Sequence, residues 1–435
     1  MFKTIFLVCL SFYVVLAKHE QYEGYAVYDV TVTTKEEGIF LNDLEEQIHI
    51  DILSHVAPGR SGQVLVPKDQ REQFQDLLTD SGIEFKIVTE NVVEELLLED
   101  EKLAAASKTS NKSSSRIGLS FDTIHRYSVV DQYLVDLAAA YPNIVTVVSG
   151  GNSFEGRDIK YLKISTTNFQ DRSKPIVYIQ SLLHAREWIT LPATLYAIEK
   201  LVIDVVEQDL QQDIDWIIVP IANPDGYEFA HTNTRFWRKN RATGYSVGDT
   251  CIGVDLNRNF DILWGTASSS NVCSETFHGR GPASEPEIVA LQSIAGQDAN
   301  RVELFLDIHS YGSMILFGWG TGALPPNALV INYVGVLMAQ AIDRVKWQSN
   351  INYIVGNTFH VLYAASGSAG DYGLAIGSPL SYTYELPAYR NSGGLNGFLV
   401  DPDFIEQAGF ETWEGIKEGA RFARDNYRRR HGYSN

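Results

Sequence analysis

The first hundred residues of the chain alternate between strand-like and helix-like patterns. Apolar and polar residues alternate over 25–34 (YAVYDVTVTT), and apolar residues recur at helical spacing over 35–48 (KEEGIFLNDLEEQI). A short strand at 62–67, a helix at 68–82 that ends at a glycine, and a further strand at 83–92 complete the unit. This strand–helix–strand–helix–strand order predicts a small α+β open sandwich.

From Ile117 onward the pattern is that of a large α/β domain. Strands are predicted at 144–151, 159–166, 175–182, 215–224 and 302–311, and helices at 131–142, 191–206 and 284–296. Several of the strand segments are continuously apolar, as strands buried on both faces are. No internal repeat is visible. The pattern therefore predicts a sheet covered by helices on both sides.

The segment between these two units has two parts. Residues 92–106 have the spacing of a connecting helix, and residues 107–118 (SKTSNKSSSRIG) break it with serine, asparagine and lysine. Such a segment is exposed and easily cut. It is either an ordinary interdomain linker or an activation segment that a trypsin-like protease cleaves at its basic residues, Lys108, Lys112 and Arg116. The pattern that starts at Asn111 is also an acceptor for N-glycosylation.

The N-terminus has the pattern of a secretory signal peptide. Lys3 precedes an apolar run over 5–16, and Ala17 ends a stretch suited to cleavage. The run is shorter than the ~20 residues that span a bilayer, and no later stretch is long and apolar enough to do so. A buried strand at the start of a domain is the alternative. We expect residues 1–17 to be removed and the protein to be extracellular.

Composition and charge narrow the class of protein. A chain of 435 residues with 45% hydrophobic and 20% charged residues suits two globular domains. The net charge of −19 argues against nucleic acid or an anionic membrane as partner. Residues 18–116 hold 20 acidic and 10 basic residues, about half of that net charge. Of three cysteines, Cys9 lies in the signal peptide, which leaves Cys251 and Cys273 to close one loop in an oxidising compartment.

Residues of the types that bind metals stand at or just after the ends of two predicted strands. His184 and Glu187 follow the strand in YIQSLLHAREWIT, and His309 ends the strand in VELFLDIHSYG. A catalytic zinc ion takes three protein ligands of these types and leaves a fourth position for water. If the fold brings the two strand ends together, these residues meet that need. A hydrogen-bonded structural histidine at a strand end is the alternative interpretation.

Six motifs occur together in one order: HAREW, RFWRKNR, GVDLNRNF, DIHSY, LYAASGSAGDYG and SYTYELPAYR. Together they resemble the zinc metallocarboxypeptidases of the pancreatic procarboxypeptidase A/B type, over nearly the whole chain. The resemblance implies a mixed β-sheet flanked by helices. It also implies a signal peptide (1–17), an inhibitory propeptide domain (18–99), a connecting helix with the activation segment (100–116) and a catalytic domain (117–435).

The same resemblance implies one Zn²⁺ per chain, held by His184, Glu187 and His309. Glu385 matches the general base, and Arg238 matches the residue that stabilises the oxyanion. Residues that match substrate-binding positions are Asn257 and Arg258 at the terminal carboxylate, the mobile Tyr363, and Arg186, Tyr311 and Phe398 in further subsites. The implied partners are peptide or protein C-termini as substrate and a trypsin-like activating protease, for a monomeric digestive enzyme.

Two features depart from the pattern or leave specificity open. Pro387 stands where vertebrate members usually carry an arginine, so we expect Asp255 to lack the ion-pair partner usual in the family and the surroundings of the base to be built differently. The resemblance places Gly370 at the floor of the side-chain pocket, where it offers no charge to a buried cation and so favours A-type specificity for aliphatic and aromatic residues. Asp371 beside it could turn inward, so B-type (Lys/Arg) or broad specificity stays open. A catalytically silent peptide-binding protein would need a missing ligand or base, and neither is missing.

Overall fold

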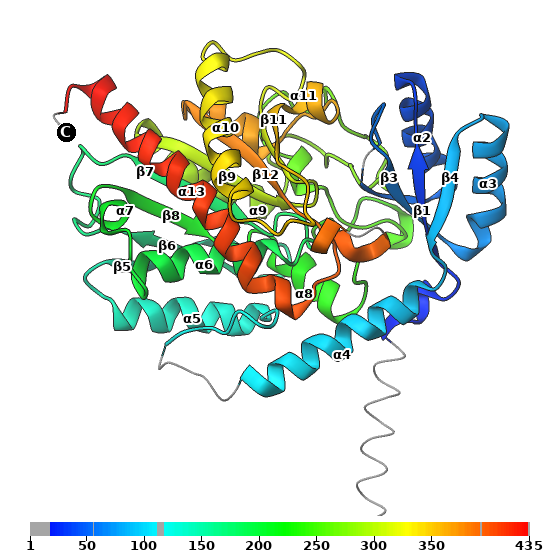
Figure 1. Ribbon diagram of the computed structural model, residues 1–435, viewed down its shortest axis with the longest axis horizontal. Coiled ribbons are helices and arrows are strands. Elements are labelled where there is room, and N and C mark those ends of the chain that lie inside the picture. The colour runs from blue at the N-terminus through cyan, green and yellow to red at the C-terminus, as the bar shows by residue number, and fades with distance from the viewer. Residues whose placement is uncertain (1–17, 55, 111–116, 392–393, 434–435) are drawn as a thin grey trace, which may run out of the picture.

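The computed structural model describes residues 18–54, 56–110, 117–391 and 394–433. The predicted signal peptide, Asn111 and the basic residues Lys112 and Arg116 lie outside these ranges. Within them, one four-stranded sheet forms an N-terminal domain and one eight-stranded sheet forms a larger C-terminal domain (Figure 1). No helix of the described residues combines the length and apolarity that a membrane span needs.

The N-terminal domain is an antiparallel sheet with two helices on one face. Its strands lie in the order β2 (Asp51–Ser54), β3 (Gly62–Val66), β1 (Ala26–Thr31) and β4 (Glu84–Thr89), and its helices are α2 (Lys35–Ile48) and α3 (Arg71–Asp80). Strand β2 is missing from the predicted elements, because four residues directly after a helix show too little alternation to be recognised. The order is therefore β–α–β–β–α–β.

Alternation along its strands gives this small sheet two buried faces. Successive side chains of a strand point to opposite sides. Tyr28 and Val30 pack under α2 and α3, whereas Val27 and Leu65 pack on the other side against Phe398 of the C-terminal domain. The second face is thus an interface between the two domains.

A long helix, α4 (Val92–Ser110), leaves the small domain and runs along the C-terminal domain (Figure 1). Glu99 on this helix accepts hydrogen bonds from Arg235 Nε at 2.8 Å and Nη2 at 3.0 Å, and both side chains are buried. The backbone N–H of Val400 donates to the same carboxylate at 2.8 Å. A buried, hydrogen-bonded ion pair therefore holds α4 in place.

The C-terminal sheet is mixed, as the resemblance implied. Its strands lie in the order β11 (Ile354–Asn357), β10 (Met314–Phe317), β12 (Leu380–Leu386), β9 (Val302–Ser310), β7 (Ile176–Ser181), β8 (Asp215–Val219), β6 (Asp158–Ile164) and β5 (Val145–Asn152). The four central strands, β12, β9, β7 and β8, are parallel to one another. Antiparallel pairs flank them on both sides.

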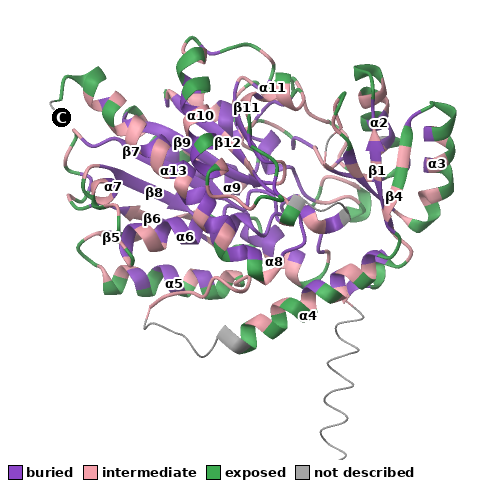
Figure 2. Cartoon of the chain, viewed as in Figure 1, coloured by how far each residue is buried: buried purple, intermediate pink, exposed green. Residues whose placement is uncertain are grey.

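Helices cover both faces of this sheet. One face carries α5 (Tyr127–Ala140), α6 (Thr190–Val202), α10 (Ala328–Asp343) and α13 (Pro402–His431), and the other carries α9 (Pro286–Gly296) and α12 (Ala369–Ala375). Along β7, Val177 and Ile179 face the first set and Tyr178 faces the second. The central strands β7, β8 and β9 are buried along their whole length (Figure 2), which explains their continuous apolar sequences.

The remaining helices are short. They are α7 (Gln208–Gln212), α8 (Pro224–Thr232), α11 (Thr358–Val361), and the 3-10 turns η1 (Glu20–Tyr22), η2 (Lys68–Gln70), η3 (Val247–Asp249), η4 (Leu256–Arg258), η5 (Ala299–Arg301), η6 (Tyr389–Asn391) and η7 (Gly394–Gly397). Strands β10, β11 and β12 and helices α10 and α13 are not among the elements predicted from the sequence.

The sheet order brings the polar motifs to one edge. Strands β7, β9 and β12 are parallel neighbours, so their carboxyl ends lie side by side. His309 on β9 is paired in register with Glu385 on β12. His184 follows β7 on the next strand along. Residues more than a hundred positions apart in the chain therefore meet at one site.

Candidate functional site

Three side chains at this edge form a cluster that can hold one metal ion. One ligand atom from each of His184, Glu187 and His309 lies within 4.8 Å of the others, and all three residues are buried. Glu187 Oε1 lies 2.7 Å from His184 Nδ1, and Glu187 Oε2 lies 2.8 Å from His309 Nδ1. Two histidines and a glutamate are the ligand set of catalytic zinc sites, so the residues fit that ion.

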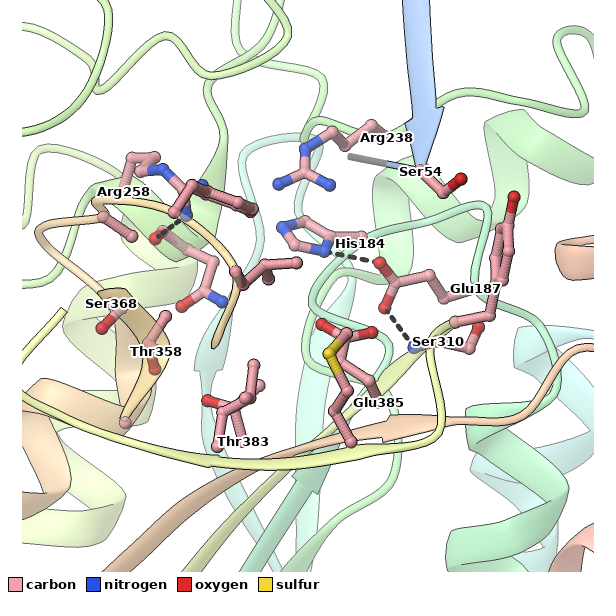
Figure 3. Close-up of a pocket in the computed structure, with 18 of the residues that line it drawn as sticks. Ser54, His184, Glu187, Arg238, Arg258, Ser310, Thr358, Ser368, Thr383 and Glu385 are labelled. Carbon is pink, nitrogen blue, oxygen red and sulfur yellow. Dashed lines mark hydrogen bonds and ion pairs between the residues drawn. The ribbon is translucent and has the colours of Figure 1, made fainter. Parts of the chain in front are cut away.

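A tight turn after β7 places the first two ligands. Leu182 adopts a positive φ of 54°, and the backbone N–H of Glu187 donates to the carbonyl of His184 at 3.3 Å. The turn leads into α6, so both side chains stand at the strand edge rather than inside the sheet. The backbone N–H of Ser310 donates to Glu187 Oε2 at 3.2 Å and ties this turn to β9 (Figure 3).

Asp255 contacts one residue of the cluster, His184, and pairs with Arg238 in place of the arginine that is missing at position 387. Its Oδ2 accepts hydrogen bonds from Arg238 Nη2 at 2.9 Å and Nε at 3.2 Å, and its Oδ1 lies 3.0 Å from His184 Nε2. Burial alone raises the pKa of Asp255, but the charges of Arg238 and His184 prevail and hold it well below its usual value. Arg238, on the loop after α8, supplies the cation.

Glu385 lies beside the metal cluster without belonging to it. It lines the same pocket as His184 and Glu187 (Figure 3). Burial raises the pKa of Glu385 to about 8, and the neighbouring His309 opposes that rise. A carboxyl whose pKa lies near neutrality can take up and return a proton at physiological pH.

A second group of residues stands at the other end of the pocket. Arg258 Nη2 donates to the hydroxyl of Tyr363 at 3.1 Å, and Arg258 Nη1 donates to the carbonyl of Asn257 at 2.9 Å. The side-chain oxygen of Asn257 accepts from the N–H of Ala369 at 2.8 Å, which fixes its amide. A guanidinium fork beside an amide and a phenol is suited to a carboxylate.

The predicted residues of the further subsites contact one another and also the N-terminal domain. Arg186 lies over the ring of Phe398, 4.8 Å from its centroid, and that ring makes an edge contact with Tyr311. Arg186 Nη1 pairs with Asp51 on β2 at 2.7 Å, and the hydroxyl of Tyr311 donates to Gln63 on β3 at 2.8 Å. The small domain therefore occupies this part of the site.

Gly370, the residue predicted at the floor of the side-chain pocket, lines the pocket. Gly370 lies on α12, where an added Cβ would come 3.0 Å from Thr383 Oγ1. Asp371 also lines the pocket, and its two oxygens lie 3.0 and 3.1 Å from the N–H of Gly320. Burial raises the pKa of Asp371 to about 6. The floor thus holds a carboxyl that is bound to backbone.

The pairing of the two remaining cysteines is confirmed. Cys251 and Cys273 form a disulfide. The loop that it closes carries Asp255, Asn257 and Arg258, so the covalent bond constrains the segment that supplies three site residues.

Three site-related features are absent from the sequence analysis. Asp307 contacts His309 Nε2 at 2.7 Å, and the Asp-x-His spacing on one strand was the signal for it. The contacts of Asp51 and Gln63 across the domain interface left no signal, because each joins segments over a hundred residues apart. The same holds for the Glu99–Arg235 pair.

Comparisons with known proteins agree with this geometry. Residues 130–415 match the zinc carboxypeptidase family, and residues 28–99 match the carboxypeptidase activation peptide family. Carboxypeptidase B of Helicoverpa zea is 42% identical over 96% of this chain and 97% of its own length. Carboxypeptidase A2 of Rattus norvegicus is 30% identical over 94% of this chain and 95% of its own.

A solved structure extends the similarity to three dimensions. The crystal structure of carboxypeptidase A from Helicoverpa armigera shares 63% sequence identity and a TM-score of 0.90, over 92% of this chain and 98% of that one. The metal cluster, the mixed sheet and the N-terminal sandwich all fit such an enzyme. The chain belongs to the zinc carboxypeptidase family and carries that family's activation peptide ahead of its catalytic domain.

Proposed function

We propose that the protein is the zymogen of an extracellular, digestive A-type carboxypeptidase, which removes aliphatic or aromatic residues from the C-termini of peptides. The observation that carries the A-type assignment is the pocket floor. Gly370 provides no carboxylate for a lysine or arginine side chain, and the pocket wall includes the apolar residues Met314, Leu316 and Ala365. An unpaired cation buried there would cost several kcal/mol.

The proposed domain organisation follows the chain. Residues 1–17 would direct secretion, 18–99 would inhibit, 100–116 would be cut on activation, and 117–435 would catalyse. The disulfide fits an oxidising compartment outside the cell. The basic residues near Arg116 fit a trypsin-like activating protease, and the catalytic domain would act as a monomer.

Substrate binding is assigned to the residues at the carboxylate end of the pocket. Arg258 would pair with the terminal carboxylate in a bidentate contact, and Asn257 would donate to the same group. Tyr363 already touches Arg258, so its ring stands where it can close over the last residue of the substrate. Arg186, Tyr311 and Phe398 would line the subsites further along the peptide.

The chemical step is assigned to two residues beside the metal cluster. Bound zinc, held by His184, Glu187 and His309, would supply a Lewis acid and lower the pKa of water. Glu385 would take a proton from the attacking water and return it to the leaving amine. Arg238 would stabilise the negative charge on the substrate carbonyl oxygen, because its double hydrogen bond to Asp255 fixes the plane of the guanidinium group.

In the zymogen the small domain blocks this site. Ile52, Leu53 and Ser54 of the β2 segment line the same pocket as Glu385. The Asp51 contact with Arg186 and the Gln63 contact with Tyr311 occupy positions that a peptide substrate would need. Cutting the activation segment and releasing the small domain would therefore expose the subsites.

B-type specificity is the second candidate. Asp371 favours it, because its carboxyl lines the pocket next to Gly370, and the similar protein of Helicoverpa zea is named carboxypeptidase B. A-type specificity is preferred, since both Asp371 oxygens are already close to the N–H of Gly320.

The test is the ratio of kcat/KM for matched peptides that end in Phe, Leu or Arg, measured after trypsin treatment. We expect Phe or Leu to be hydrolysed more efficiently than Arg. A preference for Arg would overturn the A-type assignment and point to Asp371 or another acid in the pocket as the group that binds the substrate cation.

A further inference from the structure

The two histidines of the metal cluster are held in the same way. Each presents Nδ1 to Glu187 and Nε2 to a buried carboxylate: His184 Nε2 lies 3.0 Å from Asp255 Oδ1, and His309 Nε2 lies 2.7 Å from Asp307 Oδ2. Both nitrogens of each ring therefore face a carboxylate, which only accepts hydrogen bonds. A metal ion held by Nδ1 and Glu187 would take the Nδ1 lone pair, so the ring proton would lie on Nε2, where Asp255 or Asp307 accepts it.

His309 Nε2 has one further neighbour, the side-chain nitrogen of Asn257 at 3.2 Å. An amide NH₂ donates, and a protonated Nε2 cannot accept. Because Asn257 uses its side-chain oxygen to bind the N–H of Ala369, its amide cannot turn over to accept from His309. The tautomer of His309 is therefore set by Asp307.

Asp307 differs from Asp255 in how its charge is shared. Asp255 also accepts two hydrogen bonds from Arg238 and one from the N–H of Asn257. The hydrogen bonds of the Asp307 carboxylate, by contrast, go to His309 and to the side-chain amide of Gln180, at 2.9 Å. The Asp307 side chain has no exposed surface. Its charge therefore acts mainly on the His309 ring.

A buried chain of hydrogen bonds keeps Asp307 in place. Gln180 and Asp307 are directly opposite each other on the parallel strands β7 and β9. Tyr178, two residues earlier on the same side of β7, donates its hydroxyl to Gln180 Oε1 at 2.9 Å. This contact fixes the amide so that its NH₂ group points at Asp307. Tyr178 is itself stacked on Phe305, 4.6 Å between ring centroids.

We propose that Asp307, held by Gln180 and Tyr178, is a positioning residue that fixes His309 as an Nδ1 ligand and sets how firmly the chain retains zinc. The inference rests on the zinc site of the family and is independent of the A-type assignment. Partners that hydrogen-bond to metal-ligating histidines commonly change metal affinity 10–100-fold when they are replaced.

The test compares zinc release from the intact, zinc-loaded zymogen into a chromogenic chelator. Asp307→Asn keeps the shape but removes the charge and allows the wrong tautomer, so we expect release to be about 10–100-fold faster. The absorption spectrum of the Co²⁺-substituted protein should change with it. The matched control is Glu303→Gln, a buried carboxyl on the same strand that binds Asn426 and Arg430 instead.

Tyr178→Phe provides a second variant, which keeps the stacked ring and removes only the hydroxyl. We expect its release rate to fall between those of the wild type and Asp307→Asn. A wild-type release rate and Co²⁺ spectrum in Asp307→Asn would overturn the proposal, and so would equal acceleration by Glu303→Gln. If Asp307→Asn does not fold, a wild-type rate in Tyr178→Phe overturns it.

Discussion

The interface between the propeptide and the catalytic domain should weaken as the pH rises. A cavity in this interface is lined by the carboxyls of Glu45 and Asp51 from the propeptide and Glu275 from the catalytic domain. Burial, together with the nearby charges of Asp51 and Glu275, raises the pKa of Glu45 to about 8. The pKa of Glu275 is raised for the same two reasons, burial first and Asp51 second.

Other ionisable groups also surround Glu45 and Glu275. The titratable or charged residues that face this cavity or act on its carboxyls are His49, Tyr22 and Tyr25 from the propeptide and Arg186, Lys239 and Arg238 from the catalytic domain. Arg186, a cation that acts on Glu45, is already paired with Asp51. It lowers the pKa of Glu45 less than burial and the two carboxylates raise it.

The direction and size of the pH dependence of docking follow from the linkage between proton binding and docking. A carboxyl whose pKa is higher in the docked state binds a proton more tightly there, so docking is strongest below pH 4.5 and weakens up to about pH 8. The rise of the Glu45 pKa from 4.5 to about 8 corresponds to at most about 5 kcal/mol of docking free energy. This is an upper limit because part of the burial of Glu45 comes from the propeptide itself. The dissociation constant should therefore rise by up to about tenfold per pH unit for each such carboxyl.

The assay is size-exclusion chromatography of zymogen that has been cut in the activation segment, at pH 6, 7 and 8. We expect free propeptide to increase with pH in the wild type. Glu45→Gln should retain docking at pH 8 and flatten this dependence, whereas Glu72→Gln, an exposed carboxyl on α3, should behave as wild type. Propeptide release that does not depend on pH would contradict this prediction. The same pH dependence of release in Glu45→Gln as in the wild type would also contradict it.

Three further substitutions test separate parts of the account. Glu385→Gln should lower kcat at least ~100-fold with zinc content unchanged; loss of zinc by metal analysis would show that Glu385 is a ligand. Gly370→Asp should shift the kcat/KM ratio of Arg to Phe peptides toward Arg by ~1–3 kcal/mol, if Thr383 yields to the new side chain; an unchanged ratio would place the floor elsewhere. Glu99→Gln should leave Arg235 buried without its counter-charge and weaken docking by ~3–5 kcal/mol, seen as activity of the uncut zymogen; a silent uncut zymogen would contradict this.

The sequence predicted those helices and strands whose caps or apolar spacing can be recognised from neighbouring residues alone. The helix over 35–48 forms with the predicted bounds because Thr34 caps the N–H of Glu37 while the Glu37 side chain accepts from the N–H of Thr33. Strands β2, β10 and β11 have four residues each, too few to show a period. Their structure depends on pairing with distant strands.

The residues of the site also fall into two groups: those that a local motif indicates and those that depend on tertiary packing. The ligands His184, Glu187 and His309 lie in short motifs at strand ends, where a pattern can indicate them. The ion pair between Arg238 and Asp255 and the hydrogen bond between Gln180 and Asp307 depend on how loops and strands pack, so no local pattern shows them. At Asp255, the sequence indicated that the usual arginine partner is missing, but it did not show that Arg238 supplies the cation instead.

The proposal that this chain is the zymogen of a zinc-dependent carboxypeptidase is tested most directly by its peptidase activity. The activity is measured before and after the activation segment is cut, with and without a zinc chelator. We expect the intact chain to hydrolyse a peptide ending in Phe only slowly, and trypsin cleavage to increase the rate greatly. The product should be the single C-terminal residue. The chelator should abolish this activity, and added zinc should restore it. Equal activity of the intact and cut forms, or activity that survives complete removal of zinc, would contradict it.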